Sequence, residues 1–261
     1  MRIGLIGTAL NPLERGGPAP ELAALFPDAS CHAFPSRVPA FPYTPLEQAM
    51  QALGHAEAAL SAAEQGCAAA VIDSVGDYGQ AAMRAMLPIP TIGSGEAGLA
   101  EAATGGRRFG IVTVWPESMN FILAERLQSC GVAEQCTGIV NIGSDDDAAS
   151  LTGPGSYLAQ VREGQAAILQ RVLARIETLV AGGAEAVMLG CTCMSAMAQS
   201  VAAASPVPVI NPLAAGLRAA LAAPPIALPP QPREGRPALL RAMVDAVAGE
   251  MTEDCPVCIA G

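Results

Sequence analysis

Residues 183–191 read GAEAVMLGC, a run of small and apolar residues that starts with glycine and ends in Cys191. Residues 66–74 read GCAAAVIDS, which also starts with glycine, has an apolar centre and ends in Ser74. Short apolar runs bounded by glycine and polar residues are typical of strands buried inside a parallel sheet. We therefore expect two related buried strands, with Cys191 and Ser74 at their carboxyl ends.

Two more pairs of segments repeat along the chain in the same order. Residues 88–90 read PIP and residues 206–208 read PVP, while the tripeptide AGL occurs at residues 97–99 and again at 215–217. All of these matches share one offset of about 118 residues, although the abundance of alanine makes any single match less telling. The pattern predicts an internal duplication, in which the two strand-end residues occupy equivalent positions in two similar halves.

Strand-like apolar runs alternate with helical patterns over most of the chain. Strands are expected at residues 2–8, 68–74, 89–93, 108–114, 137–142, 184–190 and 207–210. Apolar residues at a 3.6-residue spacing predict intervening helices, for example at residues 46–65 and 161–181. Because strands joined by such helices form parallel βαβ units, the predicted fold class is α/β. We expect two pseudo-symmetric, flavodoxin-like (Rossmann-like) parallel-sheet halves, with the active site in the cleft between them.

This order of elements also predicts how the chain is divided. The expected parts are residues 1–100 with about 210–222 as the first α/β half, residues 101–209 as the second half, and residues 223–261 as a Pro-rich connector, a short helix and a tail with the CxxC pair Cys255 and Cys258. Ligands of open α/β sheets bind at the carboxyl ends of the strands. Ser74 and Cys191 are therefore expected to face one cleft from opposite sides, as a proton transfer at the two faces of one carbon requires.

The composition excludes several classes of enzyme. All fourteen basic residues are arginine, so the chain has neither the Schiff-base lysine of pyridoxal-phosphate enzymes nor the lysine of a P-loop. A zinc site would need four clustered ligands, and His32 and His55 are far in sequence from the Cys191-x-Cys193 pair. We therefore expect no cofactor and no metal. The net charge of −10 disfavours nucleic acid as a partner.

Hydropathy bears on location and assembly. The N-terminal apolar run is too short for a signal peptide, and no stretch is apolar enough to span a bilayer, so we expect a cytoplasmic protein without a membrane partner. Its eight cysteines are then expected to be mostly reduced thiols. Because 51% of the residues are hydrophobic and only 15% are charged, part of the surface is predicted to be covered in a homo-oligomer.

Four segments together resemble one enzyme family. Residues 189–192 (LGCT) resemble the second catalytic-cysteine motif of the aspartate/glutamate racemase superfamily. Residues 95–97 (GEA) look like a segment of its hydantoin racemases, residues 105–113 (GGRRFGIVT) are similar to the strand that opens the family's second half, and Asn11-Pro12 is similar to its substrate loop. The resemblance extends over about residues 1–220. It implies a cofactor-independent racemase that acts on a small molecule: a hydantoin, an amino acid or a related carboxylate.

One position departs from the hydantoin racemase pattern. That family carries its first cysteine in the motif Cys-Phe-Gly-Asp, whereas this chain reads Ser74-Val75-Gly76-Asp77. The family uses one cysteine as thiolate base and one as thiol acid, and a serine hydroxyl titrates far above a thiol. Ser74 can therefore be an engineered replacement, part of a natural one-cysteine mechanism, or a position whose role passes to another residue or a water.

Two alternative functions stay open because of Ser74. A one-cysteine site is similar to that of the arylmalonate decarboxylases, in which a single cysteine protonates the carbanion after the loss of CO2. The other alternative is a ligand-binding relative without catalytic activity. A racemase would exchange the Cα proton with solvent, a decarboxylase would release CO2 from a disubstituted malonate, and a binding protein would do neither.

The resemblance and the strand-end positions together give the predicted site. Cys191 is the expected acid/base on one face of the substrate carbon, and Ser74 is the twin group on the other face. The residues expected to bind substrate are Asn11, Val75, Gly76, Asp77, Thr113 and Thr192. A helix that begins at Thr192 would point backbone N–H groups at Cys191 and favour its thiolate. The predicted reaction is racemisation or epimerisation at an acidic Cα–H by direct proton transfer.

Overall fold

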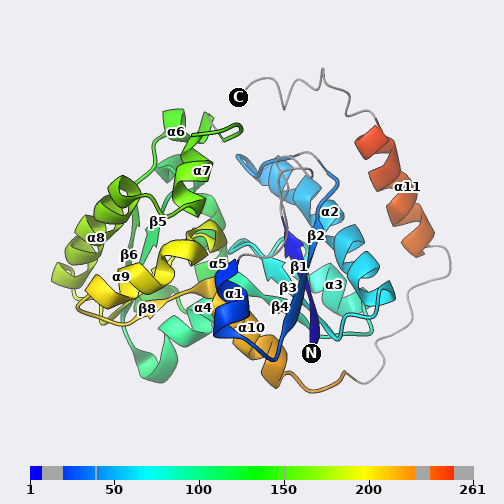
Figure 1. The fold of residues 1–261 in the computed structure, drawn as a ribbon, viewed down its shortest axis with the longest axis horizontal. Coiled ribbons are helices and arrows are strands. Elements are labelled where there is room, and N and C mark those ends of the chain that lie inside the picture. Colours follow the sequence, from blue (N-terminus) through cyan, green and yellow to red (C-terminus); the bar gives the residue numbers. More distant parts are fainter. Residues whose placement is uncertain (8–19, 39, 150, 227–235, 250–261) are drawn as a thin grey trace. The chain divides into compact units, whose positions relative to one another are not determined.

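The computed structural model describes residues 1–7, 20–38, 40–149, 151–226 and 236–249 (Figure 1). This part of the chain forms two compact units, the first containing residues 1–93 and those from 217 onward, the second residues 94–216. None of the described helices is long and apolar enough to cross a membrane. The CxxC tail and most of the Pro-rich connector lie outside the described residues.

The first unit is built on a four-stranded parallel sheet. Its strands are β1 (Arg2–Gly7), β2 (Ser30–Pro35), β3 (Ala69–Asp73) and β4 (Thr91–Gly93), in the order β2-β1-β3-β4. Its helices are α1 (Pro20–Leu25), α2 (Pro45–Glu64), α3 (Gln80–Met86) and α11 (Arg236–Gly249). The long helix α2 packs against β1, β2 and β3. The sheet places the carboxyl ends of β1 and β3 side by side, with Gly7 beside Asp73.

The second unit contains a second four-stranded parallel sheet. Its strands are β5 (Phe109–Thr113), β6 (Cys136–Asn141), β7 (Ala186–Leu189) and β8 (Val209–Ile210), in the order β6-β5-β7-β8. Its α-helices are α4 (Ser94–Ala102), α5 (Asn120–Ser129), α6 (Asp145–Ala149), α7 (Tyr157–Arg162), α8 (Ala166–Ala181), α9 (Ala198–Ala204) and the first part of α10 (Pro212–Ala222). Short 3-10 helices are η1 (Thr104–Gly106), η2 (Glu117–Met119), η3 (Ala133–Gln135) and η4 (Thr192–Met197).

Helices cover both faces of the second sheet. Val187 and Leu189 belong to the buried cluster that α8 forms with its Ile168, Val172, Ile176 and Leu179. Met188, between them on β7, points to the other face, where its sulfur lies against Gly98 of α4. Successive strand residues alternate between faces, so an apolar run such as that of β7 needs an apolar partner on each side.

The two sheets have the same topology. In each, the first strand of the unit lies second in the order, between the second and third strands, and all strands are parallel. β3 and β7 therefore occupy equivalent positions, as the repeated sequence predicts. The predicted fold class, α/β with two parallel-sheet halves, is confirmed. The cleft between the halves stays a prediction, because each unit is described by itself.

The structure differs from the sequence-based expectations at two places. The strand β2 was not predicted, because its residues, SCHAFP, mix polar and apolar side chains and most are only half-buried. The single helix expected over residues 161–181 is broken into α7 and α8. The break lies at Gly164, whose φ of +64° is a left-handed conformation that ends a helix.

Small residues let α2 lie close to the first sheet. A Cβ atom at Gly4 of β1 would lie 2.7 Å from the Cβ of Ala62, which is too close for two carbon atoms. Alanines of α2, including Ala56, Ala59 and Ala62, are buried together with Ile6 and Ile72 of the strands. The alanine-rich composition of this helix is thus explained by its close packing on the sheet.

The helix α11 packs on α2 of the first unit (Figure 1). Val244 of α11 is almost fully buried and contacts Val38 and Ala40, with Leu240 packed beside them. This apolar contact attaches the helix predicted after the Pro-rich connector to the first unit.

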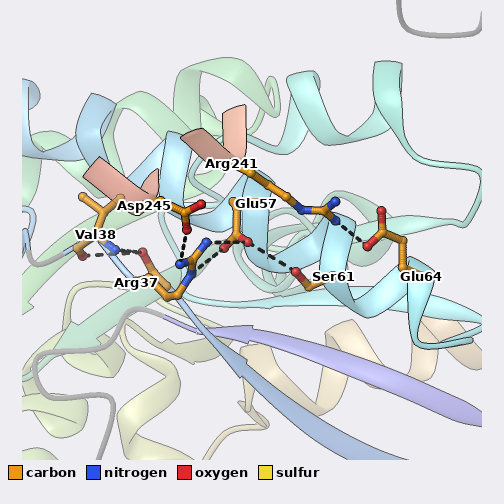
Figure 2. Close-up of polar contacts among 8 residues, drawn as sticks. Arg37, Val38, Glu57, Ser61, Glu64, Arg241 and Asp245 are labelled. Carbon is orange, nitrogen blue, oxygen red and sulfur yellow. Dashed lines mark hydrogen bonds and ion pairs between the residues drawn. The ribbon is translucent and has the colours of Figure 1, made fainter. Parts of the chain in front are cut away.

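Ion pairs join α11 to α2 and to the segment after β2 (Figure 2). Arg37 donates to both carboxylate oxygens of Glu57, at 2.9 and 3.3 Å, and to Asp245 of α11 at 2.6 Å. Arg241 of α11 pairs with Glu64 at the end of α2. Glu57, with 6% of its side chain exposed, needs such a partner, because an unpaired buried carboxylate is costly. These carboxylates raise the pKa of Arg37, with the hydrogen bond to Glu57 as the largest cause.

Candidate functional site

The two predicted catalytic residues follow equivalent strands. Ser74 comes directly after β3, whereas Gly190 lies between the end of β7 and Cys191. The backbone N–H of Gly76 donates to Ser74 Oγ at 3.2 Å, and that of Cys193 donates to Cys191 Sγ at 3.1 Å. In both units the strand-end side chain thus caps the turn that follows it, through the residue two positions later. The equivalence inferred from the repeated sequence has a local structural counterpart.

In each sheet the residues at the ends of two neighbouring strands form a pair in which one residue is glycine and the other carries a side chain. In the first unit Asp73 of β3 lies beside Gly7 of β1. In the second unit the order is reversed, because Gly190 lies beside Thr113 of β5. A Cβ atom at Gly190 would lie 2.6 Å from the Cβ of Thr113, so only glycine fits next to this threonine. Each sheet accepts one side chain at this pair of positions.

Thr113 is buried at the end of β5 and contacts both the β7 end and its own loop. Its Oγ1 is 3.5 Å from the carbonyl oxygen of Gly190 and accepts the N–H of Trp115 at 3.3 Å. The second unit therefore brings Thr113 next to the residue that precedes Cys191. The contact of Thr113 with substrate stays a prediction.

Cys191 is joined to Cys193 by a disulfide, with 5.2 Å between the two Cα atoms. Cys191 has 8% of its surface exposed and belongs to the buried cluster of the second unit, against which Cys193 is packed. Among the described cysteines this pair is the exception to the expectation of mostly reduced thiols, since Cys31, Cys67, Cys130 and Cys136 are reduced. Cys31 and Cys136 remain free thiols, and burial raises the pKa of each. No group of residues in the described part of the chain is suited to hold a metal ion.

The turn after Cys191 differs from the expected helix. Thr192 is buried and opens η4, a 3-10 helix of six residues, before α9 starts at Ala198. Cys191 is the N-cap of η4, with extended backbone angles and its sulfur accepting the N–H of Cys193. The predicted N–H donation to Cys191 is therefore present, but it comes from a 3-10 turn.

The loop from Ser74 to Tyr78 is closely packed. A Cβ atom at Gly76 would lie 2.2 Å from the ring of Tyr78, and that ring packs against His55 of α2 with 5.6 Å between centroids. Asp77 is buried with a positive φ of 48°, and a Cβ atom at Gly93 of β4 would lie 2.4 Å from its carboxyl carbon. Asp77 therefore braces the loop against β4, and its predicted contact with substrate stays a prediction. Val75 is also buried in this loop.

The predicted residues fall into two groups. The first unit brings together Ser74, Val75, Gly76 and Asp77, and the second brings together Thr113, Cys191 and Thr192. Asn11 lies outside the described residues. A shared site made of both groups requires the two units to face one another, and this arrangement stays a prediction.

Two residues that the sequence did not point to hold the loop after β5. The hydroxyl of Tyr157, on α7, donates to the carbonyl oxygen of Val114 at 2.8 Å, and Asn141 Nδ2 donates to the carbonyl oxygen of Trp115 at 2.8 Å. Burial raises the pKa of Tyr157 to about 12, which keeps its hydroxyl protonated as a donor. Neither residue is part of a recognisable motif, so no sequence signal could have identified this role.

Comparisons with known proteins place the fold. A family model described as Asp/Glu/Hydantoin racemase matches residues 23–220. An allantoin racemase from Klebsiella pneumoniae is similar in structure, with a TM-score of 0.67 and 24% identity over 85% of this chain and 86% of its own. An arylmalonate decarboxylase has a TM-score of 0.55 and 18% identity over 85% of this chain and 92% of its own. Comparison with curated proteins by sequence gives no match.

A third similar structure carries a modified cysteine. It is a cysteine-to-serine mutant of maleate cis-trans isomerase from Nocardia farcinica with a covalently bound succinylcysteine intermediate. Its TM-score is 0.60, with 16% identity over 85% of this chain and 93% of its own. At these identities the structural likeness establishes the fold.

The α/β fold with two four-stranded parallel sheets is the fold of the allantoin racemase structure. The family model covers well over half of the chain. The protein belongs to the Asp/Glu/hydantoin racemase family.

Proposed function

We propose that the protein is a cofactor-independent racemase or epimerase, in which Cys191 transfers a proton at the acidic Cα of a small substrate. The observation that carries this proposal is the position of Cys191 in the family's fold. Its sulfur lies at the carboxyl end of β7, the edge where open α/β sheets bind ligands, and it accepts a backbone N–H. A thiol in such a place can act as base when ionised and as acid when protonated.

The donor to the sulfur favours the reactive form of Cys191. An N–H that points at a sulfur stabilises negative charge there, so the Cys193 amide at 3.1 Å supports the thiolate over the thiol. Cα protons are weakly acidic, so the carbanion itself also needs stabilisation. Donors held at the substrate's oxyanion supply roughly 3–4 kcal/mol each in acyl-transfer enzymes, and the turns after β3 and β7 are the places that could supply them here.

Ser74 is the proposed group on the second face of the substrate carbon. Its Oγ accepts the backbone N–H of Gly76, and the sulfur of Cys191 accepts that of Cys193, so each accepts the N–H of the residue two positions later. This correspondence supports a shared site in the cleft between the units. Since a hydroxyl is a weak base, we infer that proton transfer at the Ser74 face is slow, and because two enantiomers have equal free energy, this step limits racemisation in both directions.

The proposed substrates are small carboxylates or ring imides, namely hydantoins including allantoin, aspartate and glutamate. The allantoin racemase from Klebsiella pneumoniae, with a similar structure, supports the ring substrates. We propose neither nucleic acid nor a membrane as a binding partner. A homo-oligomer and a cytoplasmic location remain predictions.

A second candidate is a one-cysteine decarboxylase that releases CO2 from a disubstituted malonate and protonates the product from the Cys191 side. The serine at position 74 favours it, because this reaction needs an acid on one face only. The arylmalonate decarboxylase among the similar structures supports the same alternative. A ligand-binding relative without activity is the third possibility.

Fully reduced protein should be tested, because Cys191 in the disulfide has no proton to transfer. Enantiopure 5-substituted hydantoins, allantoin, aspartate and glutamate would be followed by polarimetry, and disubstituted malonates by CO2 release. We expect loss of optical rotation with at least one of these substrates, abolished in Cys191→Ala and faster in Ser74→Cys. CO2 release without racemisation would move the protein to the decarboxylase alternative. Binding without either reaction would support the non-catalytic one.

A further inference from the structure

Cys193 has a relationship to Cys191 that the proposed proton transfer does not use. The two residues form a disulfide across the turn after β7, with Cα atoms 5.2 Å apart. Proton transfer by Cys191 would need only one sulfur. A second sulfur in bonding position beside the proposed acid/base requires an explanation of its own.

The backbone explains why these two sulfurs can meet. Residues two apart on a strand share a face, whereas here Cys191 is extended with φ −151° and ψ 140°, and the chain then turns into η4. This turn returns Cys193 toward Cys191, with its N–H on the Cys191 sulfur at 3.1 Å. Cys193 is half-buried against the core of the second unit. The pair is therefore held by local structure and needs no domain movement to form.

We propose that Cys191 and Cys193 are a redox-active dithiol, which a hydroperoxide converts into the disulfide and a small dithiol or protein dithiol reduces again. The inference rests on the proposed function for its consequence, since a disulfide-bonded Cys191 has no proton to donate and no thiolate to accept one. Cys193 acts as the resolving cysteine that limits oxidation of Cys191 to a reversible form.

The chemistry of the pair balances in two steps. The Cys191 thiolate attacks the outer oxygen of the hydroperoxide, the O–O bond breaks, and Cys191 becomes a sulfenic acid while an alcohol or water leaves. The Cys193 sulfur then attacks the Cys191 sulfur, the S–O bond breaks, and the hydroxide leaves with the Cys193 proton as water. The hydroperoxide takes up two electrons in all. A reducing dithiol returns them by thiol–disulfide exchange and itself becomes a disulfide.

The substrate-binding edge makes this modification consequential. Cys191 lies at the carboxyl end of β7, so its disulfide stops the proposed acid/base without disturbing the strand. Cys255 and Cys258 in the C-terminal tail form another closely spaced pair that could react with the peroxide. The test therefore uses full-length protein in which both tail cysteines are replaced by serine.

The reduced protein would be titrated with hydrogen peroxide, alkylated, and analysed by peptide mass mapping, in parallel with the racemisation assay. We expect the peptide with Cys191 and Cys193 to lose both alkylation sites and the mass of two hydrogen atoms, and to regain both with dithiothreitol. In Cys193→Ser, we expect dimedone to trap the sulfenic acid of Cys191. Without dimedone, Cys191 should be oxidised further to sulfinic acid, which dithiothreitol does not reduce. Cys136→Ser, the same change at a half-buried cysteine of the same unit, is the matched control and should behave as the parent.

Each activity is compared with that of the same variant before oxidation, so a lower starting rate in a variant does not matter. Recovery by dithiothreitol in the parent and in Cys136→Ser, with little recovery in Cys193→Ser, supports the dithiol. Disulfide formation in a protein that racemises nothing when reduced supports the pair and refutes the proposed function. If Cys191 passes to sulfinic acid equally with and without Cys193, the redox proposal is wrong, whatever the activity.

Discussion

A methyl group added at Gly190 tests the packing that positions Cys191. In Gly190→Ala the new Cβ would lie 2.6 Å from the Thr113 Cβ and 3.1 Å from Ile111 Cγ2, against a normal carbon–carbon separation of about 3.5–4.0 Å. Both neighbours belong to the central strand β5, so neither can move as a flexible side chain would. Overpacking of this kind costs about 1–3 kcal/mol. We expect the midpoint of thermal unfolding to fall by about 2–10 °C.

The nature of the clash predicts which second change relieves it. Thr113→Ala removes the γ atoms but keeps the Cβ at 2.6 Å, whereas Thr113→Gly removes the clashing atom and reproduces the order of the first unit, where Gly7 lies beside Asp73. In double-mutant cycles by urea unfolding, Gly190→Ala should couple to Thr113→Gly by about 1 kcal/mol or more and to Thr113→Ala by much less. Gly182→Ala, with its nearest contact at 3.3 Å, is the control, and we expect a change within about 0.5 kcal/mol. Equal coupling to both threonine variants would refute the reasoning.

Two further predictions concern stability. The pKa of Tyr157 is raised to about 12 by burial, above about 10 for an unfolded tyrosine, so its contribution is complete below pH 10 and is lost as the pH rises to 12. Between pH 10 and 12, the free energy of unfolding measured in urea should fall by about 2–3 kcal/mol less in Tyr157→Phe than in the parent. The chain has no lysine that would titrate in this window. Parallel plots of unfolding free energy against pH for the two proteins would contradict this prediction. At the α11 contact, Arg37→Met should cost about 1–3 kcal/mol because it leaves Glu57 buried and unpaired, less than for a fully buried pair since Arg37 is 39% exposed. Asp245→Asn, at a side chain 63% exposed, should cost about 0.5 kcal/mol or less, and equal effects of these two variants would count against the ranking.

The sequence was sufficient to predict the sheets because the central strands are apolar on both faces. β3 and β7 are buried on both faces, so their residues read as continuous apolar runs. The edge strand β2 was missed for the converse reason: its SCHAFP residues are half-buried and keep polar side chains. Periodicity also could not separate α7 from α8, because the break depends on one glycine with positive φ, Gly164.

The site could be predicted only in part. The repeat identified Ser74 and Cys191 as equivalent, and both cap their turns in the same way. The disulfide could not be foreseen, because the spacing Cys-x-Cys does not reveal that an extended residue is followed by a 3-10 turn. The support of the loop after β5 by Tyr157 depends on residues more than 40 positions apart, which no local pattern records.

The most direct test of the central claim is solvent deuterium exchange at Cα, followed by proton NMR, with fully reduced protein and 5-substituted hydantoins, allantoin, aspartate and glutamate in D2O. The account predicts loss of the Cα proton signal for at least one substrate, no loss with Cys191→Ala, and faster loss with Ser74→Cys. Exchange that persists in Cys191→Ala would show that Cys191 is not the acid/base. The absence of exchange in both the reduced parent and Ser74→Cys would show that proton transfer at Cα is not the reaction of this protein.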